Sequence, residues 1–569
     1  MAVGSAGERR TPPHAMLRCT ELGPLRGSRW ATLAIALWAA LQTLLRVPDP
    51  ATLLFTRQDV AYQLTGAMQV LFGEHPFVDF RSVYGPLVFY ASALGQWIGA
   101  ERAVAEFVLQ ALAFALAYAL LFRLTWAASG RFGIAFGSTL FAVTLMPRIW
   151  SYYLVLGPML TMYTAWRYVE RPGRSSLALL AVAVAVAGLF RADFGVYCAL
   201  GAFIAVGTRP APSTAVRLRR VASLALAVFL CATPWLVFVA IRGGLSDYLF
   251  DSIGASAAVA RVFALPFPGF NPHLIPFYRA ENALPILFPL VNLVPSAALG
   301  VLIATRGRFA AEQRAQLFCA LAIAQGTLVQ SLHRSDYWHL LQAIPASFVL
   351  WAWLAGLAFP AGALGNMPTR AGFSRMLVAA GLVVLYGTLA THDWPGLDVV
   401  SKWRHLRLHS SSRAEVLVHA EREDLRRGPV DLVLYVRECV EPSQRILALP
   451  RLMSIYYTSG RPFGGGQMLV APGYFTAPED QQRMVESLQS DGTVLLIDIP
   501  HYRYDGRDEN RTDLYAPIVA DYLRESFVPV RRFGEAVVGV HRDRLDAFSR
   551  AHAGNRRCLG RLWERRAKR

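Results

Sequence analysis

Residues 177–207 read LALLAVAVAVAGLFRADFGVYCALGAFIAVG, an apolar stretch whose polar break is Arg191-Ala192-Asp193. A helix needs about 20 predominantly apolar residues to span a bilayer. A helix that is apolar on every side lies in a membrane or deep inside a protein. The stretch therefore predicts two membrane helices, near 177–190 and 194–207, joined by a short polar turn.

The same pattern extends over most of the chain. Hydrophobic residues make up 54% of the 569 residues and charged residues only 17%, against about 25% in a typical soluble domain. A shorter run at 86–100 carries Phe89, Tyr90 and Trp97 and predicts an interfacial helix. Eleven apolar runs predict a polytopic α-helical membrane protein with about eleven transmembrane helices, near 30–46, 103–122, 133–146, 153–166, 177–190, 194–207, 221–241, 284–304, 316–330, 339–358 and 376–391.

The distribution of arginine indicates how these helices are oriented. With the N-terminus in the cytoplasm, the inner connecting segments hold 19 arginines and the outer segments hold 10, which is the bias of the positive-inside rule. Ten of the 15 acidic residues before residue 392 lie in the outer segments. The net charge of +18 therefore indicates membrane orientation, and we expect no nucleic-acid partner.

The composition changes near residue 392 to that of an ordinary soluble protein. Strand-like runs at 445–449, 493–499 and 536–541 alternate with helix-like stretches at 478–490 and 514–526, which predicts a small sheet covered by helices. The sequence thus predicts three parts: a cytoplasmic tail (1–29), a transmembrane module (30–391) whose first outer loop is 47–102, and an extracytoplasmic α/β domain with a basic tail (392–569).

The six cysteines show no CxxC or Cys/His spacing, so they give no support for a zinc site. Three of them lie within apolar runs. Cys439 and Cys558 could form a disulfide if the C-terminal domain lies outside the cytoplasm, where disulfides persist. The sequence alone leaves this pairing open.

The first outer loop carries charged side chains on a turn-rich stretch. Arg57 and Asp59 follow the first span, and residues 73–80 (GEHPFVDF), Arg81 and 84–87 (YGPL) come next. One interpretation is a solvated loop with one or two ion pairs. The other is an active site at the membrane surface in which Asp59 is the general base.

Further polar groups interrupt apolar runs on the same predicted face. Residues 332–339 (LHRSDYWH) join two runs, Arg191 and Asp193 break the stretch quoted above, and Arg148 lies between two other spans. Each arginine with a nearby aspartate could simply form an ion pair. Guanidinium groups also bind phosphate through forked hydrogen bonds, so the set predicts a site for a lipid-linked phosphate.

The order Asp59, 73–80 (GEHPFVDF) and 84–87 (YGPL) resembles the first outer loop of the GT-C class of integral-membrane glycosyltransferases. That class includes the protein O-mannosyltransferases and the bacterial lipid A aminoarabinose transferases. The resemblance implies a polyprenyl-phosphate sugar donor, Asp59 as the base, and inversion at the anomeric carbon. Many members have Asp-Glu at the first position, whereas this chain has Asp59-Val60, so a divalent metal is not supported and Asp79 is the expected second carboxylate.

The predicted function is therefore transfer of a sugar to an envelope glycan, lipid or protein in a bacterial inner membrane. A glycan ligase and a lipid-linked glycan transporter or flippase are the alternatives. No cofactor is indicated. The predicted catalytic residues are Asp59 and Asp79, and the predicted donor-binding residues are Arg57, Arg81, Tyr84, Arg148, Arg191, Asp193, His333, Arg334, Asp336 and His339.

Overall fold

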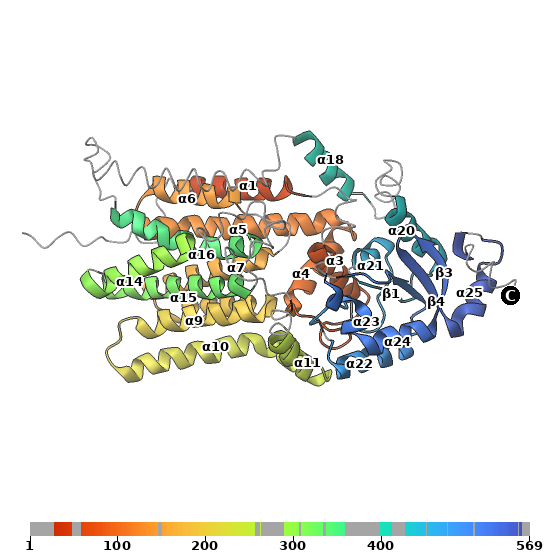
Figure 1. Cartoon of the computed structure of the whole chain (residues 1–569). Helices are drawn as coiled ribbons and strands as arrows, with labels where there is room; N and C mark the ends of the chain where they lie inside the picture. Colours follow the sequence, from red (N-terminus) through yellow and green to blue (C-terminus); the bar gives the residue numbers. More distant parts are fainter. Residues whose placement is uncertain are drawn as a thin grey trace, which may run out of the picture.

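The computed structural model is mostly helical, with a bundle of apolar helices at one end and a small α/β domain at the other (Figure 1). Two short helices of the first outer loop lie between these parts. The structure describes residues 28–47, 58–145, 151–255, 262, 289–306, 309–333, 337–358, 399–411, 427–450, 452–474, 476–503, 507–555 and 557–559.

The predicted apolar runs coincide with helices wherever the structure describes them. Four of these helices, α5, α10, α15 and α16, are long and apolar enough to cross a membrane, and shorter apolar helices accompany them. The chain is therefore a multi-pass membrane protein, while the number of eleven spans and the orientation stay predictions. The predicted run 376–391 lies outside the described residues. The helices of the bundle are α1 (Ser28–Leu44), α5 (Ala103–Ser129), α6 (Phe132–Leu145), α7 (Tyr152–Glu170), α8 (Arg174–Phe190), α9 (Ala192–Thr208), α10 (Thr214–Ile241), α14 (Val294–Arg306), α15 (Ala311–His333) and α16 (Tyr337–Ala358).

Small residues allow the helices around the polar break to approach closely. A Cβ atom on Gly195 would lie 2.4 Å from the Cα atom of Gly188, so α8 and α9 meet backbone to backbone beside Arg191. A Cβ atom on Gly201, also in α9, would lie 2.5 Å from the Ile323 side chain of α15, so α9 also lies close to α15. Close backbone contact through small residues is how membrane helices pack without a hydrophobic driving force.

The outermost helix shows which surface meets lipid. Leu226, Phe229 and Leu230 of α10 are 57–59% exposed. A continuous apolar surface is unfavourable in water, whereas lipid hydrocarbon is as apolar as these side chains and can contact them without cost. The bundle therefore presents the surface expected of a membrane domain.

The C-terminal domain contains a four-stranded sheet with the order β1-β2-β4-β3. Strands β1 (Ile446–Ala448) and β2 (Leu495–Asp498) are parallel, and β3 (Phe527–Phe533) and β4 (Ala536–His541) are antiparallel to their neighbours. The predicted α/β architecture is confirmed, and β3 is a strand that the sequence analysis missed. The helices of this part are α18 (Val399–His409), α20 (Arg427–Cys439), α21 (Ser454–Ser459), α22 (Pro478–Ser490), α23 (Thr512–Tyr515), α24 (Pro517–Ser526) and α25 (Leu545–Ala551).

A disulfide joins Cys439, at the end of α20, to Cys558 near the C-terminus. The structure thereby answers the question that the sequence left open. Both sulfur atoms are buried in the domain, and the Tyr435 hydroxyl donates a hydrogen bond to the Cys558 carbonyl oxygen (2.9 Å). The disulfide therefore links the segment around Cys558 to the end of α20.

The first outer loop joins the two ends of the molecule. Its helices α3 (Gln58–Leu71) and α4 (Pro86–Ile98) lie where the bundle meets the C-terminal domain (Figure 1). The predicted helix at 86–100 is present as α4, with Phe89 fully buried and Trp97 72% exposed. Its position at a membrane interface stays a prediction.

Candidate functional site

The site begins with Asp59, in the first turn of α3. Its carboxylate is exposed, and it forms no ion pair with any residue that the structure describes. A helix N-terminus favours negative charge, because the first backbone N–H groups have no partner within the helix. The N-terminus of α3 is therefore a favourable position for an acidic side chain.

Tyr84 connects Asp59 to the bundle. Its ring packs against Tyr62 of α3, with centroids 5.3 Å apart, and against Tyr153 of α7, at 6.3 Å. Burial raises the pKa of the Tyr84 phenol well above its ordinary value; the Asp59 carboxylate raises it further, and the Arg191 guanidinium lowers it. Tyr84 is therefore a neutral phenol within electrostatic range of a carboxylate and a guanidinium.

The turn between α8 and α9 supplies the positive charge. Arg191 Nε donates to Asp193 Oδ1 at 2.9 Å, and both side chains are about one-fifth exposed. With its amide oriented to satisfy both neighbours, Gln330 of α15 donates to Asp193 Oδ2 (2.8 Å) and accepts from Arg191 Nη2. These contacts hold the guanidinium in one orientation, and they leave Nη1 without an assigned partner among the described residues.

Gly85 explains why the loop can lie so close to this turn. Its N–H donates to the Phe190 carbonyl oxygen at 2.9 Å. A Cβ atom at position 85 would lie 2.1 Å from the Leu189 carbonyl oxygen, so any other residue would move the loop outward. The Tyr84–Arg191 arrangement therefore depends on a glycine beside it.

The C-terminal domain also contributes to the site. Tyr474, in a short turn closed by the Ala471–Tyr474 bridge, acts electrostatically on both Tyr84 and Tyr62. A second turn of the domain holds the loop directly, because Arg81 N–H donates to the Gly466 carbonyl oxygen (3.0 Å). The loop, the bundle and the domain thus all contribute to the surroundings of Tyr84.

Arg81 has a different environment from the one predicted for a donor-binding residue. Its Nε donates to Asp251 Oδ2 at 3.1 Å, and its two terminal nitrogens bind Asp251 and Asp480. Burial lowers the pKa of Arg81, but the two carboxylates more than offset this and hold it above its ordinary value. The guanidinium therefore joins the loop to the segment after α10 and to α22 of the domain, and its role in donor binding stays a prediction.

Asp79 lies on another part of the loop. Its Oδ2 accepts a hydrogen bond from the His75 backbone N–H at 2.8 Å, and the His75 ring binds the Tyr90 hydroxyl, also at 2.8 Å. No described contact joins Asp79 to Asp59. Its role as a second catalytic carboxylate stays a prediction.

The other predicted site residues fall mostly outside the described part of the chain. His339 lies in the first turn of α16 and is half-buried. His333 ends α15, and its side chain is not described. The residues whose structure is not described are Arg57, Arg148, Arg334 and Asp336.

Sequence analysis missed the residues that connect the predicted ones. Tyr153 is the first residue of the predicted span 153–166, where nothing distinguished it from the other apolar residues. Gln330 lies within an apolar run. Tyr474 is far from the loop in the chain, so no local pattern pointed to it. Within the described residues, no group of three or more His, Cys, Asp or Glu side chains could hold a metal ion.

Comparisons with known proteins found similarity to solved structures. No family model matches the chain, and no curated protein matches it. The crystal structure of ArnT from Cupriavidus metallidurans in the apo state is similar to this chain, with 16% identity and a TM-score of 0.46, over 90% of this chain and 98% of that chain. ArnT is a lipid A aminoarabinose transferase of the GT-C class.

Proposed function

We propose that this chain is a membrane glycosyltransferase that moves a sugar from a polyprenyl-phosphate carrier to an acceptor in the cell envelope. The reaction takes place outside the cytoplasm, where the acceptor is a glycan, lipid or protein. One observation carries the proposal. Asp59 and Arg191, which is paired with Asp193, both act electrostatically on the Tyr84 phenol, where an apolar bundle meets a polar domain.

The site offers a group for each half of the reaction, namely deprotonation of the acceptor and departure of the phosphate. Asp59 accepts the proton of the acceptor hydroxyl as its oxygen bonds to the anomeric carbon. The bond from that carbon to the phosphate oxygen breaks, and polyprenyl phosphate leaves with the electron pair. A single base on one face of the sugar predicts inversion, and a positioned base contributes about 10²- to 10⁴-fold in rate.

Arg191 is suited to the departing phosphate. Its Nε and Nη2 are fixed by Asp193 and Gln330, so the guanidinium is oriented before the donor binds. Preorganised donors aimed at developing negative charge stabilise a transition state more than mobile ones do. The isoprenoid chain of the donor would lie among the apolar helices beside this turn.

The disulfide supports the proposed orientation. Structural disulfides persist in the bacterial periplasm and are rare in the cytoplasm. Cys439 and Cys558 lie in the C-terminal domain, and the arginine distribution likewise predicts that this domain lies outside the cytoplasm. The proposed acceptor is therefore a component of the envelope.

The test is sugar transfer in membranes that contain equal amounts of wild-type or variant protein, supplied with labelled polyprenyl-phosphate sugars and envelope acceptors. We expect Asp59→Asn to lower kcat by about 10²-fold or more, because the variant cannot accept the proton. Asp79→Asn is the matched comparison, with a smaller expected effect because its carboxylate binds a backbone N–H. Equal transfer by Asp59→Asn and wild type would remove Asp59 from the mechanism, and transfer of whole glycans from a lipid diphosphate would favour a ligase.

A further inference from the structure

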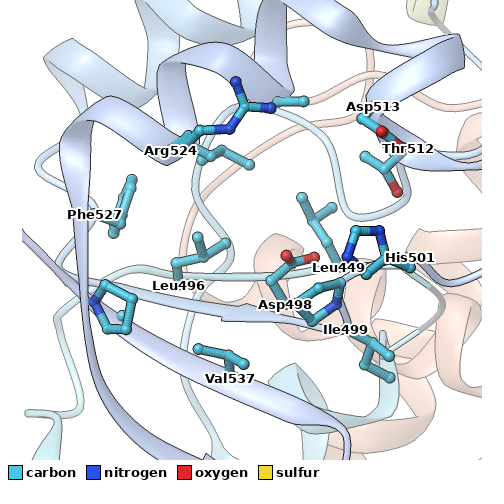
Figure 2. Close-up of a pocket in the computed structure, with 15 residues that line it drawn as sticks. Leu449, Leu496, Asp498, Ile499, His501, Thr512, Asp513, Arg524, Phe527 and Val537 are labelled. Atoms are coloured by element: carbon cyan, nitrogen blue, oxygen red, sulfur yellow. The ribbon is translucent and has the colours of Figure 1, made fainter. Parts of the chain in front are cut away.

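The C-terminal domain contains a cavity of about 350 Å³, separate from the site at Asp59 (Figure 2). It lies on one face of the sheet, beneath α23 and α24. Its floor comes from alternate residues of three strands: Leu496 and Asp498, Val537 and Gly539, and Phe527 and Pro529. Alternate residues of a strand share a face, so six positions of three neighbouring strands line the same cavity.

Most of this sheet face is an ordinary apolar core. Leu447, Leu449, Leu496 and Phe527 pack there against Leu523 of α24. The cavity begins where that core ends, and its volume is at the lower end of the roughly 300–1,000 Å³ range of small-molecule sites. An apolar floor with polar groups at one end is the usual composition of such a site.

Asp498 is the polar group on this face. Its carboxylate points into the cavity beside His501 (Figure 2). The pKa of Asp498 is raised from 3.8 to about 6, chiefly by burial; His501 and the Ile499 N–H lower it, and Asp513 adds a smaller increase. Asp498 forms no ion pair within the described residues. A carboxylate held on an apolar face without a charged partner lowers stability, which is typical of functional positions.

His501 is the second unusual feature. It is the third residue of the turn Ile499–Tyr502, which is closed by a hydrogen bond from Tyr502 N–H to the Ile499 carbonyl oxygen (3.2 Å). His501 adopts φ 63°, a conformation in which glycine is favoured and other residues are strained. The chain therefore keeps an imidazole at the cavity mouth at a position where glycine would fit the backbone better.

The charges around the cavity indicate the class of ligand. Arg511 donates to Asp513 through Nε (3.1 Å, to Oδ1) and through Nη2 (2.6 Å, to Oδ2). Arg524 Nη1 donates to Asp521 Oδ1 at 2.8 Å. Because each of these pairs is neutral overall, the ionised Asp498 carboxylate gives the cavity a net negative charge above about pH 6. A phosphate or sugar phosphate would be repelled, whereas a neutral polyol can donate to the carboxylate and place its C–H face on the apolar floor.

We propose that this cavity binds a neutral sugar residue, with the Asp498 carboxylate and the His501 imidazole hydrogen-bonding its hydroxyl groups. The binding of a sugar does not depend on the proposed transfer reaction. Its identification as part of the acceptor glycan does rest on the proposed function.

A direct structural connection supports that identification. The cavity wall at Thr512 and Asp513 belongs to α23, and the Tyr515 hydroxyl at the end of α23 donates to the Val470 carbonyl oxygen at 3.0 Å. Val470 leads into the turn that carries Tyr474, which acts on Tyr84 at the transfer site. The segment that lines the cavity is therefore hydrogen-bonded to the segment that leads to Tyr474.

The experiment measures saturation-transfer NMR signals from methyl glycosides of glucose, galactose, mannose, rhamnose, N-acetylglucosamine and arabinose, added at millimolar concentration to the full-length protein in nanodiscs. We expect at least one glycoside to bind. Asp498→Asn and His501→Gly should each weaken its binding about tenfold, as the loss of one hydrogen bond to a charged or fixed group predicts. Glu525→Gln removes an exposed carboxylate from α24 outside the cavity and should leave binding unchanged.

His501→Gly separates binding from folding, because glycine suits the backbone at φ 63° and the domain should keep its thermal stability. Unchanged binding in both cavity variants, or no signal from any glycoside, would overturn the proposal. Tighter binding of glucose 1-phosphate than of methyl glucoside would overturn the neutral class. Asp59→Asn should retain the sugar signal, so failure of the transfer reaction and failure of this site are distinguishable.

Discussion

The residues of the proposed transfer site act mainly by fixing one another. Asp59 and Arg191 both act electrostatically on Tyr84, and Arg191 is held by Asp193 and Gln330. Such a site depends on positions that carry no chemistry themselves. Gly85 is the clearest of these, because it allows the loop to touch the backbone of the α8–α9 turn.

Gly85→Ala should therefore lower activity without touching a catalytic group. The new Cβ atom meets the Leu189 carbonyl oxygen, and overpacking of this kind costs about 1–3 kcal/mol. We expect a fall in kcat for sugar transfer and a lower Tm. Gly137→Ala in α6, where a Cβ atom would meet no other atom within 4 Å, is the control, and similar losses in both variants would contradict this account.

Asp498 gives a prediction for pH dependence. Its pKa is about 6 in the folded protein against 3.8 when unperturbed, so the folded state binds the proton more tightly than the unfolded chain. The group's stabilising contribution is complete below pH 3.8 and is lost as the pH rises through about 6. Asp498→Asn should therefore raise the stability by about 1–2 kcal/mol at pH 7, reduced from the full linkage value because the carboxylate borders a cavity.

Thermal unfolding of the full-length protein in detergent at pH 5 and pH 7 measures this difference. The Tm of Asp498→Asn should exceed that of wild type more at pH 7 than at pH 5. Glu525→Gln shows the effect of removing an exposed carboxylate from the same domain. A Tm gain for Asp498→Asn that is larger at pH 5 would reverse the sign and contradict the burial argument.

At the scale of elements, the first outer loop is held to the domain by buried ion pairs. Arg81 binds Asp480 of α22, and Arg445 binds Glu74. Phe80 packs edge-on against Phe463, with ring centroids 5.6 Å apart. These contacts fix the position of the loop that carries Tyr84.

Asp480→Asn should loosen this attachment. The Asp480 side chain is only 8% exposed, and loss of a hydrogen bond to a charged partner in such a place costs about 1.5–3 kcal/mol. We expect faster amide hydrogen exchange in residues 73–85. Asp247→Asn is a matched control, because Asp247 pairs with Arg483 at an exposed position where an ion pair contributes about 1 kcal/mol or less. Equal exchange in the two variants would contradict the proposed attachment.

The elements also show what sequence could and could not predict. Long apolar runs predicted the helices of the bundle well, because burial in lipid needs little more than length and composition. Strand β3 was missed because Pro529, Arg531 and Arg532 interrupt its apolar pattern. Asp59, Tyr84, Arg191 and Asp193 were predicted as site residues, but Tyr153, Gln330 and Tyr474 join them only through tertiary contacts.

At the scale of the whole molecule, the disulfide closes the C-terminal domain. The two cysteines are 119 residues apart, and cross-linking a loop of that length stabilises the folded state by about 4–5 kcal/mol in the chain-entropy model. We expect Cys558→Ser to lower the Tm of the full-length protein by several degrees. The variant should also migrate more slowly than wild type on a non-reducing gel, and equal migration with and without reductant in the wild type would show that the bond is not formed.

The attachment of the first outer loop to the C-terminal domain, through Arg81 and its neighbours, also limits how this domain can be exchanged between proteins. Contacts of residues 65–101 with the C-terminal domain, among them Thr65 to Met453 (3.0 Å) and Tyr457 to Glu101 (3.0 Å), are specific to this pair of surfaces. A chimera that replaced only residues 392–569 would bring a foreign surface against this loop. The smallest transplantable module is therefore discontinuous: the C-terminal domain together with α3, α4 and the loop between them.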